Sequence, residues 1–261
     1  GVELVATDAP PASAAAVRLH QPRVALYRSW DASMDEGWTR WVLERYGFAY
    51  ERLTNEGVRT DDLSRFDAIL LASQDADDIL HGYSTGRMPP EYVGGIGLEG
   101  ALALQEFVEG GGTLVAFDEA TAVPIEAFGV PVRDATSDVD RDRLFIPGSL
   151  IRLRVDEEDP IAWGMRPEAA AFFSFSRAFA VSGDDEDSGR VDVVARYADE
   201  DLLMSGWEIG ADRFLAGRPA VVNVRLGEGN VVLIGFRPQF RAQSRATLKL
   251  IFNALFQAAT E

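Results

Sequence analysis

The feature that most constrains this chain is a repeated alternation of short apolar runs with helical segments between residues 23 and 117. Residues 24–27 are apolar and are followed by a polar loop and then by a stretch with helical spacing. Residues 67–72 and 113–117 are further apolar runs, typical of strands buried on both faces. Strands that alternate with helices pair in parallel, because each helix returns the chain to the same edge. The first half therefore predicts a parallel sheet with helices on both faces.

The second half is richer in strands than in helices. Gly229-Asn230 separates two apolar runs, which is a strong hairpin signal. We therefore expect antiparallel extensions of the sheet, a turn at the acidic run 184–187, and a final helix over residues 242–256 that packs on the sheet. The strand candidates in this half are 150–155, 171–175, 190–197, 220–225 and 231–234.

Composition divides the chain and excludes several classes of protein. Residues 1–22 are rich in Ala and Pro, and we expect a linker or extended arm with a short strand at 2–5 and a solvated His20; residues 23–261 are expected to form one α/β domain. The 42 acidic and 25 basic residues give a formal charge of -17, which argues against nucleic acid as a partner. No run approaches the roughly 20 apolar residues that membrane insertion requires.

The scarcity of cysteine and histidine removes much catalytic chemistry. With no Cys, the chain has no thiol nucleophile and no thiolate zinc site. His20 and His81, far apart in sequence, are the two histidines, so a zinc site or a Ser-His-Asp triad would have to use one of them.

Three segments carry a resemblance to known proteins. The tail 227–241, GEGNVVLIGFRPQFR, together with the strand and helix series, resembles the class I glutamine amidotransferase-like superfamily. The stretch 23–41, that tail and the helix 247–256 resemble the domain that follows the peptidase domain in bacterial M14 zinc carboxypeptidase-like proteins. The resemblance covers residues 23–257 and implies a flavodoxin-like, mainly parallel sheet. It also implies a larger zinc metallocarboxypeptidase-like hydrolase as the parent, its peptidase domain as the partner, and a periplasmic or secreted location. The sequence itself leaves the compartment and homo-oligomerisation open.

The resemblance also tests for activity. An active amidotransferase of this class carries its cysteine in a Gly-x-Cys-x-Gly turn after a central strand, and the corresponding stretch here is Phe-Asp-Glu-Ala-Thr, so Asp118 or Glu119 takes the nucleophile's place. No histidine follows His81, and the M14 motif His-x-x-Glu is absent because His81 is followed by Gly-Tyr-Ser. We expect a non-catalytic accessory or interaction domain that uses neither metal nor cofactor.

The strand ends supply the candidate site. Ligands of open α/β sheets bind beyond the carboxyl ends of the strands, and polar residues there would either bind a ligand or pair with one another as a structural cluster. The alternative function is a cysteine-independent carboxylate hydrolase, or a saccharide or small-acid binding domain. Two carboxylates roughly 5–9 Å apart in an open cleft would favour glycoside hydrolysis, whereas carboxylates engaged by arginine would not. The candidates are Ser29, Trp30, Asp31, Ser73, Gln74, Asp75, Asp118, Glu119, Arg237, Gln239 and Arg241.

Three further motifs have structural interpretations. The acidic run 75–78 is typical of a helix N-terminus, and the glycine-rich loop 94–100 lacks the Lys-Ser/Thr of a phosphate loop and is expected to lead into a helix. Trp30, Trp38 and Trp41 could form an aromatic platform for sugars, but the spacing of Trp38 and Trp41 predicts one buried helix face.

Overall fold

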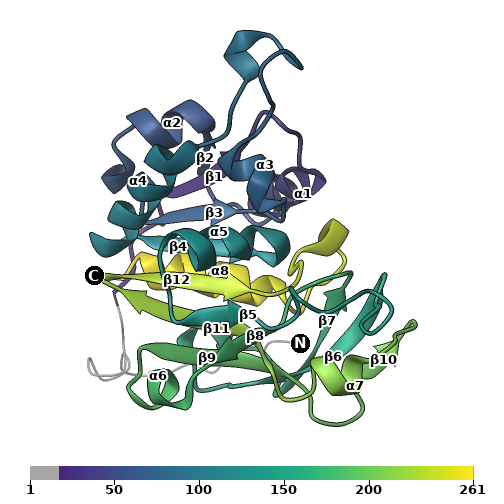
Figure 1. The fold of residues 1–261 in the computed structure, drawn as a ribbon. Coiled ribbons are helices and arrows are strands. Elements are labelled where there is room, and N and C mark those ends of the chain that lie inside the picture. The colour runs from purple at the N-terminus through teal and green to yellow at the C-terminus, as the bar shows by residue number, and fades with distance from the viewer. Residues whose placement is uncertain (1–17, 261) are drawn as a thin grey trace.

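Apolar side chains on both faces of the central strands make a sheet that must be covered on both sides. The computed structural model describes residues 18–260, in which ten strands form one sheet and helices pack on its two faces (Figure 1). The short strand expected at residues 2–5 lies outside the described residues. The expected mainly parallel α/β sheet with antiparallel extensions is confirmed.

The parallel half of the sheet holds the strands expected from the first part of the chain. Strands run in the order β2-β1-β3-β4-β12, and each adjacent pair is parallel. Their carboxyl ends therefore meet at one edge. The bounds are β1 (Val24–Arg28), β2 (Tyr50–Thr54), β3 (Ala68–Leu71), β4 (Thr113–Phe117) and β12 (Gly229–Ile234).

The antiparallel half begins at the expected hairpin, where β11 pairs with β12. The order continues through β9 to β6, and β6 pairs with β7 and with β10. β7 ends at Phe173, two residues before the expected end, because Phe175 has a left-handed φ of 51° that a strand cannot continue through. The bounds are β6 (Ser149–Val155), β7 (Glu168–Phe173), β9 (Val191–Tyr197), β10 (Leu203–Ser205) and β11 (Pro219–Leu226), with β5 (Val132–Asp134) and β8 (Phe179–Val181) in a separate two-stranded sheet.

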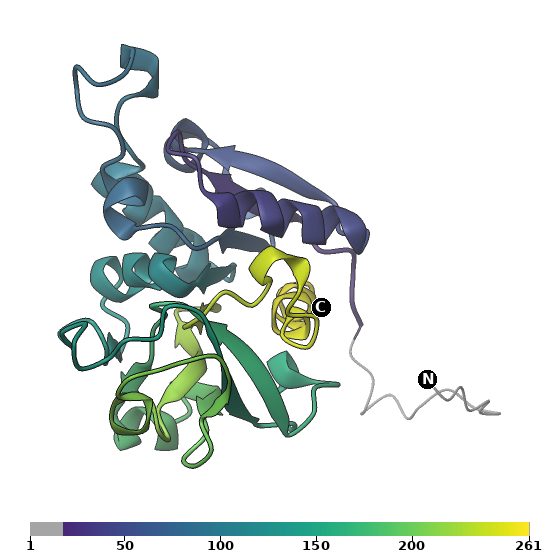
Figure 2. The ribbon, with the colours of Figure 1, turned by 90° about the vertical axis from the view of Figure 1, so that its right-hand side faces the viewer.

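The helices divide between the two faces of the parallel half (Figure 2). α1 (Met34–Arg45) and α8 (Leu248–Ala258) cover one face. The other face is covered by α2 (Asn55–Thr60), α3 (Ala76–Leu80), α4 (Gly97–Glu109) and α5 (Ala122–Ala127). The two short helices α6 (Gly183–Asp187) and α7 (Ala211–Phe214) belong to the antiparallel half.

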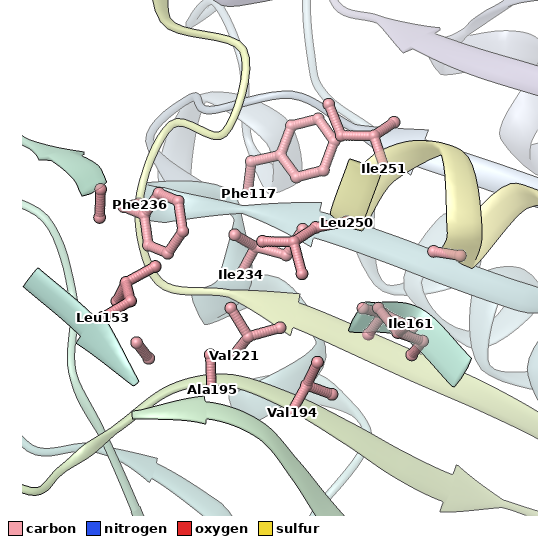
Figure 3. Close-up of a cluster of buried hydrophobic side chains, with 14 of the residues drawn as sticks. Phe117, Leu153, Ile161, Val194, Ala195, Val221, Ile234, Phe236, Leu250 and Ile251 are labelled. Atoms are coloured by element: carbon pink, nitrogen blue, oxygen red, sulfur yellow. The ribbon is translucent and has the colours of Figure 1, made fainter. Parts of the chain in front are cut away.

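Alternate residues of each central strand supply two separate cores. In β4, Val115 and Phe117 face one core while Leu114 and Ala116 face the other, and all four are fully buried. Figure 3 shows the first core, in which Phe117 of β4 lies near Leu250 and Ile251 of α8. These packed layers hold the ends of β4 and β12 in fixed positions.

Four local expectations were wrong, each for a physical reason. Trp41 is 46% exposed, because α1 buries a face containing Asp35 and Thr39 instead of the tryptophan face. The acidic run forms helix α6, capped by the Ser182 side chain, not a turn. The final helix starts at Leu248; Ala242, where it was expected to begin, has a φ of 56°, which a right-handed helix excludes.

The fourth concerns His20. Its Nε2 lies 2.9 Å from Asp67 Oδ2, and its backbone N–H donates to the Ala259 carbonyl at 3.2 Å, so this histidine is held against the domain.

Candidate functional site

The carboxyl edge of the parallel strands gathers side chains from distant parts of the sequence. β1 leads into Ser29, β3 into Ser73, β4 into Asp118, and β12 into Arg237. Since these strands are parallel neighbours, the residues that leave them lie along one edge.

Arg237 is the centre of a cluster of ion pairs at this edge. Its Nε lies 3.0 Å from Asp35 Oδ2, and its Nη2 lies 3.2 Å from Asp118 Oδ2 and 3.9 Å from Glu119 Oε2. Its remaining Nη1 donates to the Ser174 carbonyl at 3.2 Å. The Arg237 side chain is 17% exposed. We call Arg237, Asp35, Asp118 and Glu119 the Arg237 cluster; the guanidinium is used on all three of its nitrogens.

Asp118 is the residue that the turn after β4 presents. Its φ of 50° is left-handed, and the chain continues from it into a short 3-10 helix and α5. This is the geometry of a strained strand-to-helix turn of the kind that presents nucleophiles in other α/β folds. Of the two residues considered for the nucleophile's place, Asp118 therefore occupies the turn position, and Glu119 follows it.

The Asp118 carboxyl is fully buried, and its two oxygens have different surroundings. Oδ2 accepts a hydrogen bond from Ser73 Oγ at 3.1 Å, whereas Oδ1 has no hydrogen-bond partner among the described residues. Burial raises the pKa of Asp118 to about 7, with Glu119 adding to the rise and Arg237 and the Ser176 hydroxyl opposing it. This carboxyl can therefore gain or lose its proton near neutral pH.

Asp35 is the member of the cluster that sequence reasoning missed. It lies in the first turn of α1, where Ser33 caps the helix by accepting from the backbone N–H groups of Asp35 and Glu36. Burial raises the pKa of Asp35 despite the opposing charge of Arg237. Gln239 also holds the first turn of α1 in place, because its Nε2 donates to Thr39 Oγ1 at 3.0 Å and to the Asp35 carbonyl at 3.3 Å. A Ser-x-Asp start to a helix that follows a strand was the available signal.

The remaining candidates lie in a separate group or elsewhere at the edge. Gln74 Nε2 donates to Ser29 Oγ at 2.7 Å and to the Asp31 carbonyl at 3.1 Å, and Tyr83 OH donates to Asp31 Oδ1 at 3.2 Å. These contacts join the loops after β1 and β3. Trp30 packs edge-on against Tyr92, Asp75 caps α3, and the Arg241 guanidinium lies over the Phe240 ring.

The arrangement limits the chemistry available at this edge. Asp118 and Glu119 both contact the Arg237 guanidinium, which hinders their use as nucleophile or base. Among residues 18–260, no group of three His, Asp or Glu side chains is placed to hold a metal ion. No helix within that range has the length and apolarity to span a membrane.

Comparison with known proteins identifies the fold of this chain through solved structures of low sequence identity. No known protein family and no curated protein matches the chain. Solved structures match: the cytoplasmic protein STM3548 from Salmonella typhimurium has 16% identity and a TM-score of 0.55, covering 92% of this chain and 99% of that one. A β-galactosidase from Bacillus circulans sp. alkalophilus has 12% identity and a TM-score of 0.56, covering 95% of this chain but 33% of that one.

A third structure is similar over nearly the whole length of both chains. A protein from Thermoplasma acidophilum that is assigned to GMP synthase has 11% identity and a TM-score of 0.56, covering 92% of this chain and 96% of that one. Identities this low show the fold alone. The chain has the class I glutamine amidotransferase-like fold, with a large sheet flanked by helices on both faces.

Proposed function

We propose that this chain is a non-catalytic accessory or interaction domain built on the amidotransferase-like fold. The observation that carries the proposal is the Asp118–Arg237 contact of 3.2 Å, which fills the turn after β4 with a buried ion pair. An amidotransferase needs a thiolate at that turn and a histidine to activate it. The chain has no cysteine, and no histidine follows position 81.

The proposal extends to the protein that contains this domain. The chain is a domain of a larger zinc carboxypeptidase-like protein of the M14 type, and the peptidase domain is its partner. This protein is located in the periplasm or outside the cell. The support is the resemblance of residues 23–41, 227–241 and 247–256. The β-galactosidase offers a parallel, because the matching fold makes up 33% of that longer chain. Homo-oligomerisation is compatible with this role.

The alternative, a cysteine-independent hydrolase using Asp118 and Glu119, has weaker support. A pair of catalytic carboxylates needs one member free to act as nucleophile or base and an open space between the two. Here one guanidinium nitrogen lies within 3.2 Å of Asp118 and 3.9 Å of Glu119. One arginine therefore contacts both carboxylates, which leaves neither of them free to act as nucleophile or base.

Two measurements test the proposal. Incubating the purified chain with glutamine should release no more ammonia than buffer does. Ammonia release that Asp118→Ala or Glu119→Ala abolishes would overturn the non-catalytic assignment, whereas release that persists in both variants would identify a contaminant. The context is tested by the DNA upstream of the Gly1 codon: a reading frame that continues into a His-x-x-Glu peptidase domain is expected, and an in-frame stop would contradict it.

A further inference from the structure

A pocket of about 240 Å³ lies beside the Arg237 cluster. Its lining comes from three places: Glu119 after β4, the connection 135–148 between β5 and β6, and the end of β7 with the connection that follows it. Small-molecule sites usually have volumes of roughly 300–1,000 Å³. This pocket is somewhat smaller than that range, which fits a small organic molecule and excludes a nucleotide or an oligosaccharide.

One wall of the pocket is apolar. Phe173 and Ile146 are 1% exposed, and Leu144 and the Phe175 ring continue the surface. The Phe175 backbone N–H donates to the Ile146 carbonyl at 2.9 Å, which ties the two connections together. Such a wall would bind the apolar body of a ligand by removing it from water.

Two arginines supply the positive charge of the lining. The Arg141 guanidinium lies 4.8 Å from the centre of the Phe175 ring and forms no ion pair with any residue in the range 18–260. Arg177 lies 3.5 Å from Asp134, which partly satisfies it. Ser176, a residue 3% exposed, also lines the pocket, and its hydroxyl hydrogen-bonds to Asp118.

The lining contains one carboxylate, and that carboxylate has a cation beside it. Glu119 Oε2 lies 3.9 Å from Arg237 Nη2. A larger pocket of about 620 Å³ near β9 has the opposite balance, since two arginines in its lining face five carboxylates, Asp156, Glu158, Asp159, Glu186 and Asp192. In a chain with a formal charge of -17, the pocket beside the Arg237 cluster is thus a local exception that favours an anion.

Backbone strain at the pocket gives a separate indication. Phe175 in the lining and Asp118 next to Glu119 have φ values of 51° and 50°, although neither is glycine. Non-glycine residues in this conformation cost free energy and concentrate at ligand and catalytic sites. Both strained residues fix side chains that border the pocket.

We infer that this pocket binds a small monocarboxylic acid with a compact apolar body. The carboxylate accepts hydrogen bonds from Arg141, with Arg177 nearby, and the body packs on Phe173 and Phe175. Arginine pairs with carboxylates through two parallel N–H donors, so a neutral group of the same shape loses most of the recognition.

Calorimetric titration of the purified chain with benzoate at about pH 8 tests the inference, with benzyl alcohol as the neutral analogue and acetate as the acid without the apolar body. Benzoate should bind saturably, and benzyl alcohol and acetate should each bind at least about tenfold more weakly. Arg141→Gln should weaken benzoate binding by about tenfold or more. Arg141 is exposed, so this variant should fold.

The matched control is Arg143→Gln. Arg143 is an exposed arginine of the same connection, but its guanidinium lies over Phe214, outside the pocket lining. Benzoate affinity should be unchanged in this variant. The inference is overturned if benzoate gives no saturable binding, if benzyl alcohol or acetate binds as tightly as benzoate, or if Arg141→Gln and Arg143→Gln behave alike.

Discussion

Asp67 and Asp118 are buried aspartates at opposite ends of neighbouring parallel strands, and they differ in the hydrogen-bond donors that surround their carboxylates. Asp67, just before β3, accepts hydrogen bonds from the Arg23 backbone N–H at 2.7 Å and from Arg23 Nη2 at 2.5 Å, with His20 Nε2 at 2.9 Å. Asp118, just after β4, accepts from Ser73, contacts Arg237 at 3.2 Å and leaves one oxygen unpartnered among the described residues.

The pKa values move in opposite directions as a result. Burial raises the pKa of Asp67, but the side-chain and backbone hydrogen bonds from Arg23 outweigh it, so that the net pKa is below its ordinary value. Burial dominates at Asp118 and raises the pKa to about 7. How deeply a carboxylate is buried and how many donors reach it together decide which protonation state the fold favours.

The largest expected effect comes from removing the shared cation. Arg237→Ala leaves Asp35 and Asp118 buried without their positive partner, and breaking a buried ion pair in this way costs about 3–5 kcal/mol of unfolding free energy. Denaturation in urea at about pH 8 measures it. A loss below about 1 kcal/mol would mean that the Arg237 cluster contributes little to the fold.

The members of the Arg237 cluster should differ in proportion to their burial. Asp118→Ala removes a fully buried side chain and the acceptor of the Ser73 hydrogen bond, and should destabilise the domain by more than about 1 kcal/mol. Glu119→Ala should cost less, because that side chain is 35% exposed. If both variants melt at or above the melting temperature of the parent, the Arg237 cluster does not stabilise the fold. The carboxyl edge of the sheet should then be tested first as a ligand-binding site.

Asp118 should also make stability depend on pH. An acid whose pKa is higher in the folded state binds its proton more tightly there, so Asp118 stabilises the fold below its ordinary pKa of 3.8 and this contribution is lost as pH rises toward 7. The parent should therefore lose stability between about pH 4 and pH 7 relative to Asp118→Asn, which has no such proton. Parallel stability profiles of the two proteins would contradict the raised pKa.

Asp67 should show the opposite dependence with a smaller effect. Its lowered pKa stabilises the fold above the ordinary pKa, and that contribution is lost as pH falls through the still lower folded-state value. Asp67→Asn should cost about 1 kcal/mol near neutral pH, since Arg23 is 56% exposed and solvent weakens the pair. The difference from the parent should disappear in strong acid. A difference that grows in acid would show that Asp67 does not act through its charge.

The sequence predicts the parts of this edge that depend on local signals, and it does not predict the contacts between side chains that are far apart in the sequence. The strands are predictable because apolar runs and the Gly229-Asn230 turn are local signals. Parallel pairing then predicts that residues after β4 and β12 meet, which brought Asp118, Glu119 and Arg237 together.

The sequence does not predict which side chains pair with one another at this edge. Asp35 pairs with Arg237 across 202 residues, and this depends on which face α1 turns toward the sheet. The tryptophans of α1 suggested the wrong face, since Trp41 is 46% exposed while Asp35 is buried. A pattern of apolar residues assigns a charged residue such as Asp35 to the solvent-exposed face of a helix. The ion pair with Arg237 compensates the buried charge, so Asp35 can lie on the buried face instead.

Glu168 gives the smallest expected effect and separates pairing from burial. It contacts both Arg152 and Arg154, with Arg152 Nη1 at 2.7 Å, and hydrogen bonds from Arg152 together with the charge of Arg154 outweigh its desolvation and lower its pKa. Its side chain is 41% exposed, however, so water stabilises the carboxylate nearly as well when the arginines are absent. We expect Glu168→Gln to leave the urea midpoint unchanged within error, with or without added salt. If arginine contacts alone determined stability, this variant would lose as much as Arg237→Ala; a comparable loss would show that burial is not what distinguishes the Arg237 cluster.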